Sequence, residues 1–306
     1  MHSLDHIELS VPDLLQADAF FQAFGLDTRC LDGAVEIRTF NDAHMWLKIN
    51  CGPQKRLEQI VFGAYPDDLE PIAGRLETMK VLVAELRTGE KLTGLRFRDP
   101  VGTAIEVRAA GKVMPDAKAQ TCFTSCPAGE RGAAMKGQTP RVRPSRMSHA
   151  LFFTPDITTS VAFYQEALGL RISDFPGPVA FMHGAHGSDH HLIAFAQCAI
   201  GIGYHHSAWD VATLDEVGLG AGQMAAAGFD RGWGLGRHVL GSNYFHYVRD
   251  PWGSYAEYSF DIDYIPAETE WRPGYPSAEN SFYLWGPQVP EDFVTNYERH
   301  SLRTGD

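Results

Sequence analysis

The chain has 306 residues, of which 44% are hydrophobic, so it can bury one large core or two of ordinary size. Its formal net charge of −12 offers no basic surface, and we expect neither nucleic acid nor a membrane as a partner. No apolar stretch is long enough to cross a bilayer, which predicts a cytoplasmic protein. None of the five cysteines has the paired spacing of a zinc site, so we expect mostly buried, reduced thiols: Cys30, Cys51, Cys122, Cys126 and Cys198.

The N-terminal part predicts two successive strand-helix-strand units. Leu4–Asp13 (LDHIELSVPD) indicates a strand followed by Pro-Asp and a helix, and that helix ends at the glycine of FFQAFGL, Phe20–Leu26. Glycine suits the left-handed position that follows a helix C-terminus. A second unit begins near Gln59–Phe62 and ends with a strand, an Asp-Pro-X-Gly turn and a strand at Arg98–Val107 (RDPVGTAIEV).

The same pattern returns later in the chain, which indicates an internal repeat. Met147–Asp156 (MSHALFFTPD) matches the opening strand, FYQEALGL at Phe163–Leu170 matches the helix end, and Arg249–Tyr258 (RDPWGSYAEY) matches the turn. A further strand is expected at His206–Val211. These repeats predict an α+β fold of four βαβββ modules, two in each half.

We therefore expect a domain at residues 1–111, a connection at 112–145 and a second domain at 146–306. The connection is rich in Gly, Ala, Lys, Arg and Pro, and one short strand is expected near Thr121–Thr124. After Asp261 the chain is rich in Pro, Trp and Tyr, and these aromatic residues predict that the tail packs on the second half.

Superposing the two halves predicts a metal site in the second half alone. His149, His206 and Glu257 fall at equivalent strand positions of separate modules. Two imidazoles and one carboxylate on one face leave the opposite coordination positions open, the arrangement of non-haem Fe(II) sites that bind substrate and dioxygen together. The first half has His6, Gln59 and Glu106 at the matching positions, and a glutamine is a much weaker ligand. We expect it to be a metal-free structural copy.

These residues resemble the type I extradiol dioxygenases of the vicinal oxygen chelate superfamily along nearly the whole chain. The resemblance implies two tandem vicinal oxygen chelate domains, with Fe(II), or less often Mn(II), in the C-terminal one. It also implies that an aromatic diol and O2 are the substrates. The family's acid/base histidine corresponds to His191 in HHLIAF, and its pocket histidine and tyrosine correspond to His238 in GRH and Tyr247 in YFHYVRDP.

Some assignments within this resemblance remain open. His190 competes with His191, and His205 competes with His206, because neighbouring strand residues point to opposite faces. Ser281–Pro290 (SFYLWGPQVP) resembles the family's Trp-Gly-X-X-X-Pro segment, but an arginine that some members place just before it is absent, which leaves the substrate open. Candidates for the apolar pocket lining are Phe175, Phe181 and Trp209, whereas we expect surface or loop positions for His44, His183 and His186.

The predicted function is extradiol ring cleavage of a substituted catechol or biaryl diol in aromatic catabolism, by a homo-oligomer. Two alternatives remain. One is an isomerase or transferase of the same superfamily that uses its metal only as a Lewis acid, and the other is a metal-free protein that sequesters a hydrophobic drug. Neither alternative would consume oxygen on addition of a catechol.

Overall fold

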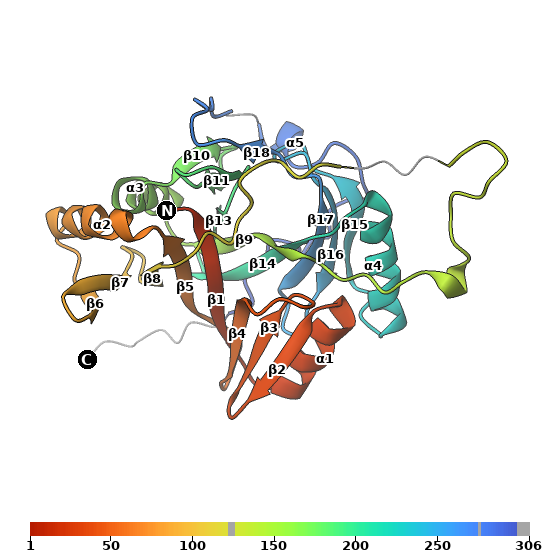
Figure 1. The fold of residues 1–306 in the computed structure, drawn as a ribbon, viewed down its shortest axis with the longest axis horizontal. Helices are drawn as coiled ribbons and strands as arrows, with labels where there is room; N and C mark the ends of the chain where they lie inside the picture. The colour runs from red at the N-terminus through yellow and green to blue at the C-terminus, as the bar shows by residue number, and fades with distance from the viewer. Residues whose placement is uncertain (122–125, 275–276, 299–306) are drawn as a thin grey trace.

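The computed structural model of the protein describes residues 1–121, 126–274 and 277–298 (Figure 1). The strand expected near Thr121–Thr124 falls on residues 122–124, outside the described residues. Across the described part, no helix combines the length and apolar character that a membrane span requires.

The first half forms one eight-stranded sheet in the order β2-β3-β4-β1-β5-β8-β7-β6. Strands β1 and β5 are antiparallel neighbours at its centre, and each also pairs in parallel with the last strand of its own module. The first module is β1 (Ser3–Val11), α1 (Leu14–Phe24), β2 (Asp27–Leu31), β3 (Ala34–Arg38) and β4 (Met45–Cys51). The second is β5 (Arg56–Ala64), α2 (Pro66–Thr78), β6 (Ala84–Thr88), β7 (Lys91–Arg98) and β8 (Ala104–Ala109).

The second half repeats this topology in the order β10-β11-β13-β9-β14-β17-β16-β15, which confirms the predicted fold class. Its first module is β9 (Arg146–Thr154), α3 (Ile157–Leu168), β10 (Arg171–Asp174), β11 (Val179–His183) and β13 (Ile193–Gln197). Its second is β14 (Gly203–Asp210), α4 (Leu214–Ala226), β15 (Gly232–Arg237), β16 (Tyr244–Arg249) and β17 (Tyr255–Phe260). Short elements complete the fold: η1 (Lys136–Gln138), β12 (Ser188–Asp189) paired with β18 (Tyr264–Ile265), and α5 (Ala278–Ser281).

The repeated Pro-Asp and glycine signals mark helix ends as predicted. Asp13 accepts a hydrogen bond from the backbone N–H of Gln16 at the start of α1. The Asp156 side chain caps α3 in the same way. Gly25 and Gly169 follow the two helices with φ of 100° and 69°, the left-handed conformation that favours glycine.

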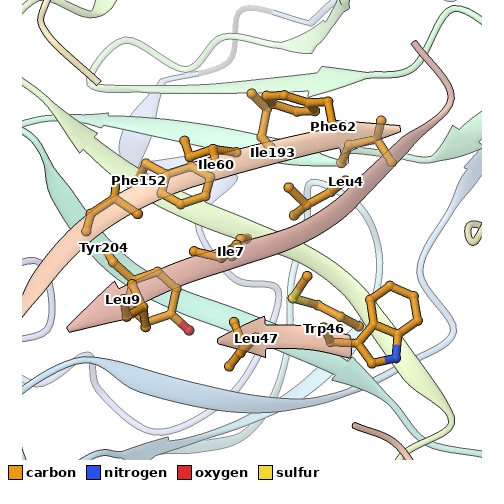
Figure 2. Packing of buried hydrophobic residues seen from close by; sticks show 14 of the residues in the cluster. Leu4, Ile7, Leu9, Trp46, Leu47, Ile60, Phe62, Phe152, Ile193 and Tyr204 are labelled. Carbon is orange, nitrogen blue, oxygen red and sulfur yellow. The ribbon is translucent and has the colours of Figure 1, made fainter. Parts of the chain in front are cut away.

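One continuous hydrophobic core runs through both halves. Ile7 and Ile60 of the first sheet are fully buried among Phe152, Ile193 and Tyr204 of the second (Figure 2). Helix α1 contacts α4, and α2 contacts α3 (Figure 1). The central strands β9 and β14 are therefore supported by the other half of the molecule.

Two β-bulges interrupt the pairing of β9 with β14, where the register leaves Ser148 and His205 as extra residues. The first sheet has bulges at the equivalent positions, with Asp5 and Glu58 as the extra residues of β1 and β5. A bulge bends its strand and redirects the adjacent side chains. The simple alternation of faces expected from the sequence therefore does not hold around His206.

The prediction of mostly buried thiols is wrong for the described cysteines. Cys30, Cys51 and Cys126 are exposed, Cys198 is half-buried, and these four are free. Cys122 lies outside the described residues. Cys30 and Cys51 end up exposed because they fall at the outer edge and end of strands β2 and β4, which the sequence pattern does not reveal.

Candidate metal centre

The central strands bring three predicted ligands together. His149 comes from β9, His206 from β14 and Glu257 from β17, and one ligand atom of each lies within 4.8 Å of the others. Glu257 Oε2 lies 3.5 Å from His149 Nε2 and 3.4 Å from His206 Nε2. All three side chains are buried.

Two atoms of this cluster have no hydrogen-bond partner. His206 Nε2 and Glu257 Oε2 are both inaccessible and unpaired. Burying a carboxylate oxygen without a donor is costly, so native proteins rarely leave one unsatisfied. A divalent cation between the three side chains would satisfy both atoms, and the donor set of two imidazoles and one carboxylate suits it.

Hydrogen bonds determine the tautomer of His206. His205 Nε2 lies 2.7 Å from the carbonyl oxygen of Phe293, which can only accept, so this nitrogen carries a proton. Nδ1 of the neutral His205 can then accept from Nδ1–H of His206, 2.6 Å away. His206 Nε2 is left with a lone pair facing the cluster. Burial lowers the pKa of both imidazoles, to about 4 for His205, which favours their neutral forms.

An equivalent chain of contacts holds His149. Ser148 Oγ lies 3.1 Å from His149 Nδ1 and 3.1 Å from Asp189 Oδ2. Because the carboxylate accepts the serine proton, the serine oxygen accepts from Nδ1–H, and the lone pair of His149 Nε2 faces the cluster. Arg146 pairs with Asp189 at 2.6 Å and so balances the buried carboxylate. Outer hydrogen bonds of this kind orient metal-binding histidines.

Asn243 holds the carboxylate and was missed by the sequence analysis. Its Nδ2 donates to Glu257 Oε1 at 3.0 Å and to Ser259 Oγ at 3.0 Å. Asn243 is fully buried, and only Oε2 of Glu257 is left to face the histidines. Asn243 lies one residue before β16, and neither the internal repeat nor a sequence motif marks this position.

A cavity of about 220 Å³ opens beside the cluster. The predicted ligands His149 and His206 line it together with His191, His238 and Tyr247. Phe181 lines it as expected, but Trp209 is buried in the core and Phe175 packs against that core, so the prediction was wrong for these two. No lysine or arginine of the described chain lines the cavity, and its remaining wall is mainly apolar: Leu151, Pro176, Pro178, Val179, Ala196, Leu240, Phe282, Phe293 and Val294.

His191 reaches the cavity from the loop between β12 and β13, not from the strand that we expected, because β13 begins only at Ile193. Its ring centroid lies 4.0 Å from that of His149. The neighbouring His190 points away from the cavity and contacts Asp174 at 2.7 Å. His205, the other competitor, also lines the cavity, because the bulge turns it to the same side as His206.

His238 and Tyr247 form a hydrogen-bonded pair at the cavity wall. His238 Nδ1 lies 2.8 Å from the carbonyl oxygen of Phe282 and therefore donates, so its Nε2 accepts from the Tyr247 hydroxyl 2.9 Å away. Burial lowers the pKa of His238 and, with the nearby Glu257 carboxylate, raises that of Tyr247 well above its ordinary value. The pair is thus a neutral imidazole and a protonated phenol.

The first half fills the equivalent position with ion pairs. Arg96 of β7 lies opposite Glu106 of β8, as Tyr247 of β16 lies opposite Glu257 of β17. Arg96 Nε is 2.7 Å from Glu106 Oε2. His6 Nδ1 lies 2.7 Å from Asp5 Oδ1. Glu106 already has a counter-ion there and does not need a metal.

Of the histidines assigned to the surface or loops, His183 is buried. It lies in β11, and its Nδ1 is 2.8 Å from Ser173 Oγ. His44 and His186 are partly exposed and pair with the Asp5 carbonyl oxygen and with Asp68. A single histidine in a short strand gives no sequence signal of its burial.

Comparison with known proteins agrees with this architecture. Residues 146–258 match the model of the Glyoxalase/Bleomycin resistance protein/Dioxygenase superfamily. The chain is 46% identical to Metapyrocatechase 2 of Cupriavidus necator over 97% of this chain and 93% of that protein. The chain therefore belongs to the type I extradiol dioxygenases of this superfamily, which are ring-cleaving enzymes.

Two solved structures share the fold. The Mn(II)-bound glyoxalase from Novosphingobium aromaticivorans superposes with a TM-score of 0.74 at 23% identity, covering 97% of each chain. The 2,2′,3-trihydroxybiphenyl 1,2-dioxygenase from Sphingomonas wittichii superposes with a TM-score of 0.72 at 18% identity, covering 94% of this chain and 99% of that one.

Proposed function

We propose that the protein cleaves the ring of a catechol-type substrate next to its two hydroxyl groups, with Fe(II) held by His149, His206 and Glu257. The observation that carries this proposal is the pair of buried, unpaired atoms, His206 Nε2 and Glu257 Oε2, that point at one another beside a cavity. Fe(II) is favoured over Mn(II) because two imidazoles and one carboxylate are the usual ligands of ferrous oxygenases. The bound metal would hold the diol and dioxygen together and pass electrons between them.

The apolar cavity provides the binding and orientation of the ring. Its size suits a single substituted ring, and its wall of Phe181, Phe282 and Phe293 contributes contacts without charge. Because no cationic side chain of the described residues lines it, we infer an uncharged substrate ring, such as catechol or an alkylated catechol. The name of the 46% identical relative fits this substrate class.

The polar groups of the wall would move and hold protons. His191 is placed to accept a proton from a substrate hydroxyl and to return it to an oxygen atom of the opening ring, as a general acid and base. The Tyr247 hydroxyl has one proton, which it donates to His238 in this structure. Rotation of this hydroxyl would direct the same hydrogen bond to a substrate oxygen on which negative charge develops. The surrounding apolar side chains exclude water and so strengthen both interactions.

The test is metal content together with oxygen uptake. We expect one iron per chain, oxygen consumption when catechol is added, and a yellow ring-opened product. His206→Ala should abolish iron binding and turnover, because one of three ligands is lost. Gln59→Ala at the equivalent position of the first half should change neither.

Other outcomes would contradict the proposal. Two metals per chain, or iron that remains bound in His206→Ala, would exclude the assigned ligands. Full activity with zinc or magnesium, or turnover of a substrate without oxygen uptake, would exclude the redox reaction and favour Lewis-acid chemistry.

A further inference from the structure

A chain of buried polar groups leads from the cavity away from the cluster. His191 Nδ1 lies 3.1 Å from His190 Nδ1, and His190 Nε2 lies 2.7 Å from Asp174 Oδ2. All three residues are buried. Of the three predicted ligands, this series of hydrogen-bonded groups contacts only His149, through the ring of His191.

The surroundings hold Asp174 and His190 in one orientation. Asp174 Oδ1 accepts from the backbone N–H of Gly274 at 2.6 Å, so Oδ2 is the oxygen that faces His190. The backbone N–H of His190 donates to the backbone carbonyl oxygen of Asp263 at 2.6 Å, and the His190 carbonyl oxygen accepts from Ser173 Oγ. The ring of Trp271 packs edge-on against His190 with 5.8 Å between ring centroids.

The donor and acceptor pattern determines which nitrogen of His191 carries a proton. An ionised Asp174 can only accept, so His190 Nε2 is protonated and its Nδ1 has a lone pair. That lone pair accepts from Nδ1–H of His191. His191 Nε2 is then unprotonated in the resting enzyme.

We propose that Asp174 and His190 are positioning residues that keep His191 in the tautomer that can accept a proton from the substrate. The inference rests on the proposed function, in which His191 is the general base. When the substrate hydroxyl gives its proton to His191 Nε2, the positive charge of the ring is shared through Nδ1–H and His190 with the Asp174 carboxylate. The same logic operates where an aspartate orients a catalytic histidine in serine proteases.

Asp174→Asn tests this assignment with little change of shape. Oδ1 of the asparagine still accepts from Gly274, so its Nδ2 faces and donates to His190 Nε2. His190 must then carry its proton on Nδ1 and donate to His191, which forces the His191 proton onto Nε2. We expect kcat to fall roughly 10²–10⁴-fold, with KM for catechol and iron content unchanged.

A second readout does not depend on activity. Nitrogen-15 NMR of the metal-free, histidine-labelled protein should show His191 protonated on Nδ1 in the wild type and on Nε2 in Asp174→Asn. The control is His2→Gln, which removes a buried imidazole whose hydrogen bonds go to Ser3 and Ala110 of the first half. It should change neither kcat nor the His191 tautomer.

His190→Gln and His190→Leu keep the test decisive if Asp174→Asn does not fold. A glutamine can donate to Asp174 and accept from His191, so His190→Gln should retain most of the kcat that His190→Leu loses. Equal kcat in the two variants, wild-type kcat in Asp174→Asn, or a wild-type His191 protonated on Nε2 would overturn the proposal. A wild-type enzyme that consumes no oxygen with any catechol would instead refute the proposed function, while the tautomer measurement would remain valid.

Discussion

At the scale of single residues, the candidate metal centre depends on neighbours that do not touch the metal position. His205 Nε2 donates a hydrogen bond to the Phe293 carbonyl oxygen, and His205 Nδ1 accepts one from Nδ1–H of His206. Without it, His206 could rotate or carry its proton on Nε2, where it would block coordination. The ligand set alone therefore does not define the site.

His205→Phe should weaken iron binding about 10–100-fold, the usual effect of removing a group that orients a ligand. The measurement is iron affinity by competition with a chelator. His246→Phe is the matched control, since His246 lies in β16, which β17 separates from β14 in the sheet, and does not line the cavity. Equal iron affinities in the two variants would show that His205 does not orient His206.

At the scale of elements, the two repeated helix ends have similar sequences but different surroundings. Gly25 and Gly169 both adopt positive φ after a helix. A Cβ atom on Gly25 would lie 2.1 Å from the carbonyl oxygen of Val142, whereas one on Gly169 would meet nothing within 4 Å. The first glycine thus allows a close approach of the connecting segment, and the second allows only the backbone conformation.

Gly169→Ala should lower the free energy of unfolding by about 1–2 kcal/mol, the cost of a left-handed residue with a side chain. Gly25→Ala should lower the free energy of unfolding by clearly more than this, because the backbone at Val142 must also move. Urea denaturation of both variants measures the difference. Equal losses of unfolding free energy in the two variants would mean that the connecting segment at Val142 adjusts freely to a side chain at position 25.

At the scale of the whole molecule, one buried ion pair joins the two halves and the C-terminal segment. Lys55 Nζ lies 3.5 Å from Glu298 Oε1 and 2.8 Å from the carbonyl oxygen of Tyr204. The two carboxylate oxygens of Glu298 accept from the backbone N–H groups of Leu57 and Tyr204, both at 2.8 Å. Tyr204 belongs to β14, so this contact supports the strand that carries His206.

Glu298→Ala should lower the free energy of unfolding by roughly 3–5 kcal/mol, because it leaves a buried ammonium group without a counter-ion. Adding Lys55→Met should recover part of this loss by removing the charge. Glu85→Ala, which breaks an exposed pair with Arg87, is the control and should cost less than about 1 kcal/mol. Similar losses for the buried and exposed pairs in urea denaturation would contradict this role of Glu298.

The sequence by itself determined the repeat and, through it, the fold and the three predicted ligands. Strand and turn signals are local, so the Pro-Asp and Asp-Pro-X-Gly motifs indicated where elements begin and end. Because the two halves share one topology, their alignment placed His206 opposite Gln59 and Glu257 opposite Glu106. The sheet registers agree with that alignment. His206 lies opposite Leu151, two residues after His149, and Gln59 lies opposite Glu8, two residues after His6.

Only the tertiary structure decided which polar groups surround these ligands. The bulges at Ser148 and His205 depend on how β9 and β14 pair. The second bulge leaves His205 and His206 both lining the cavity, although strict alternation would place only one of them there. Asn243 and Asp174 meet their partners across 14 and 16 residues of chain, in loops and at strand ends without a motif. Such contacts follow from the packing of distant segments, and no local pattern of residues encodes that packing.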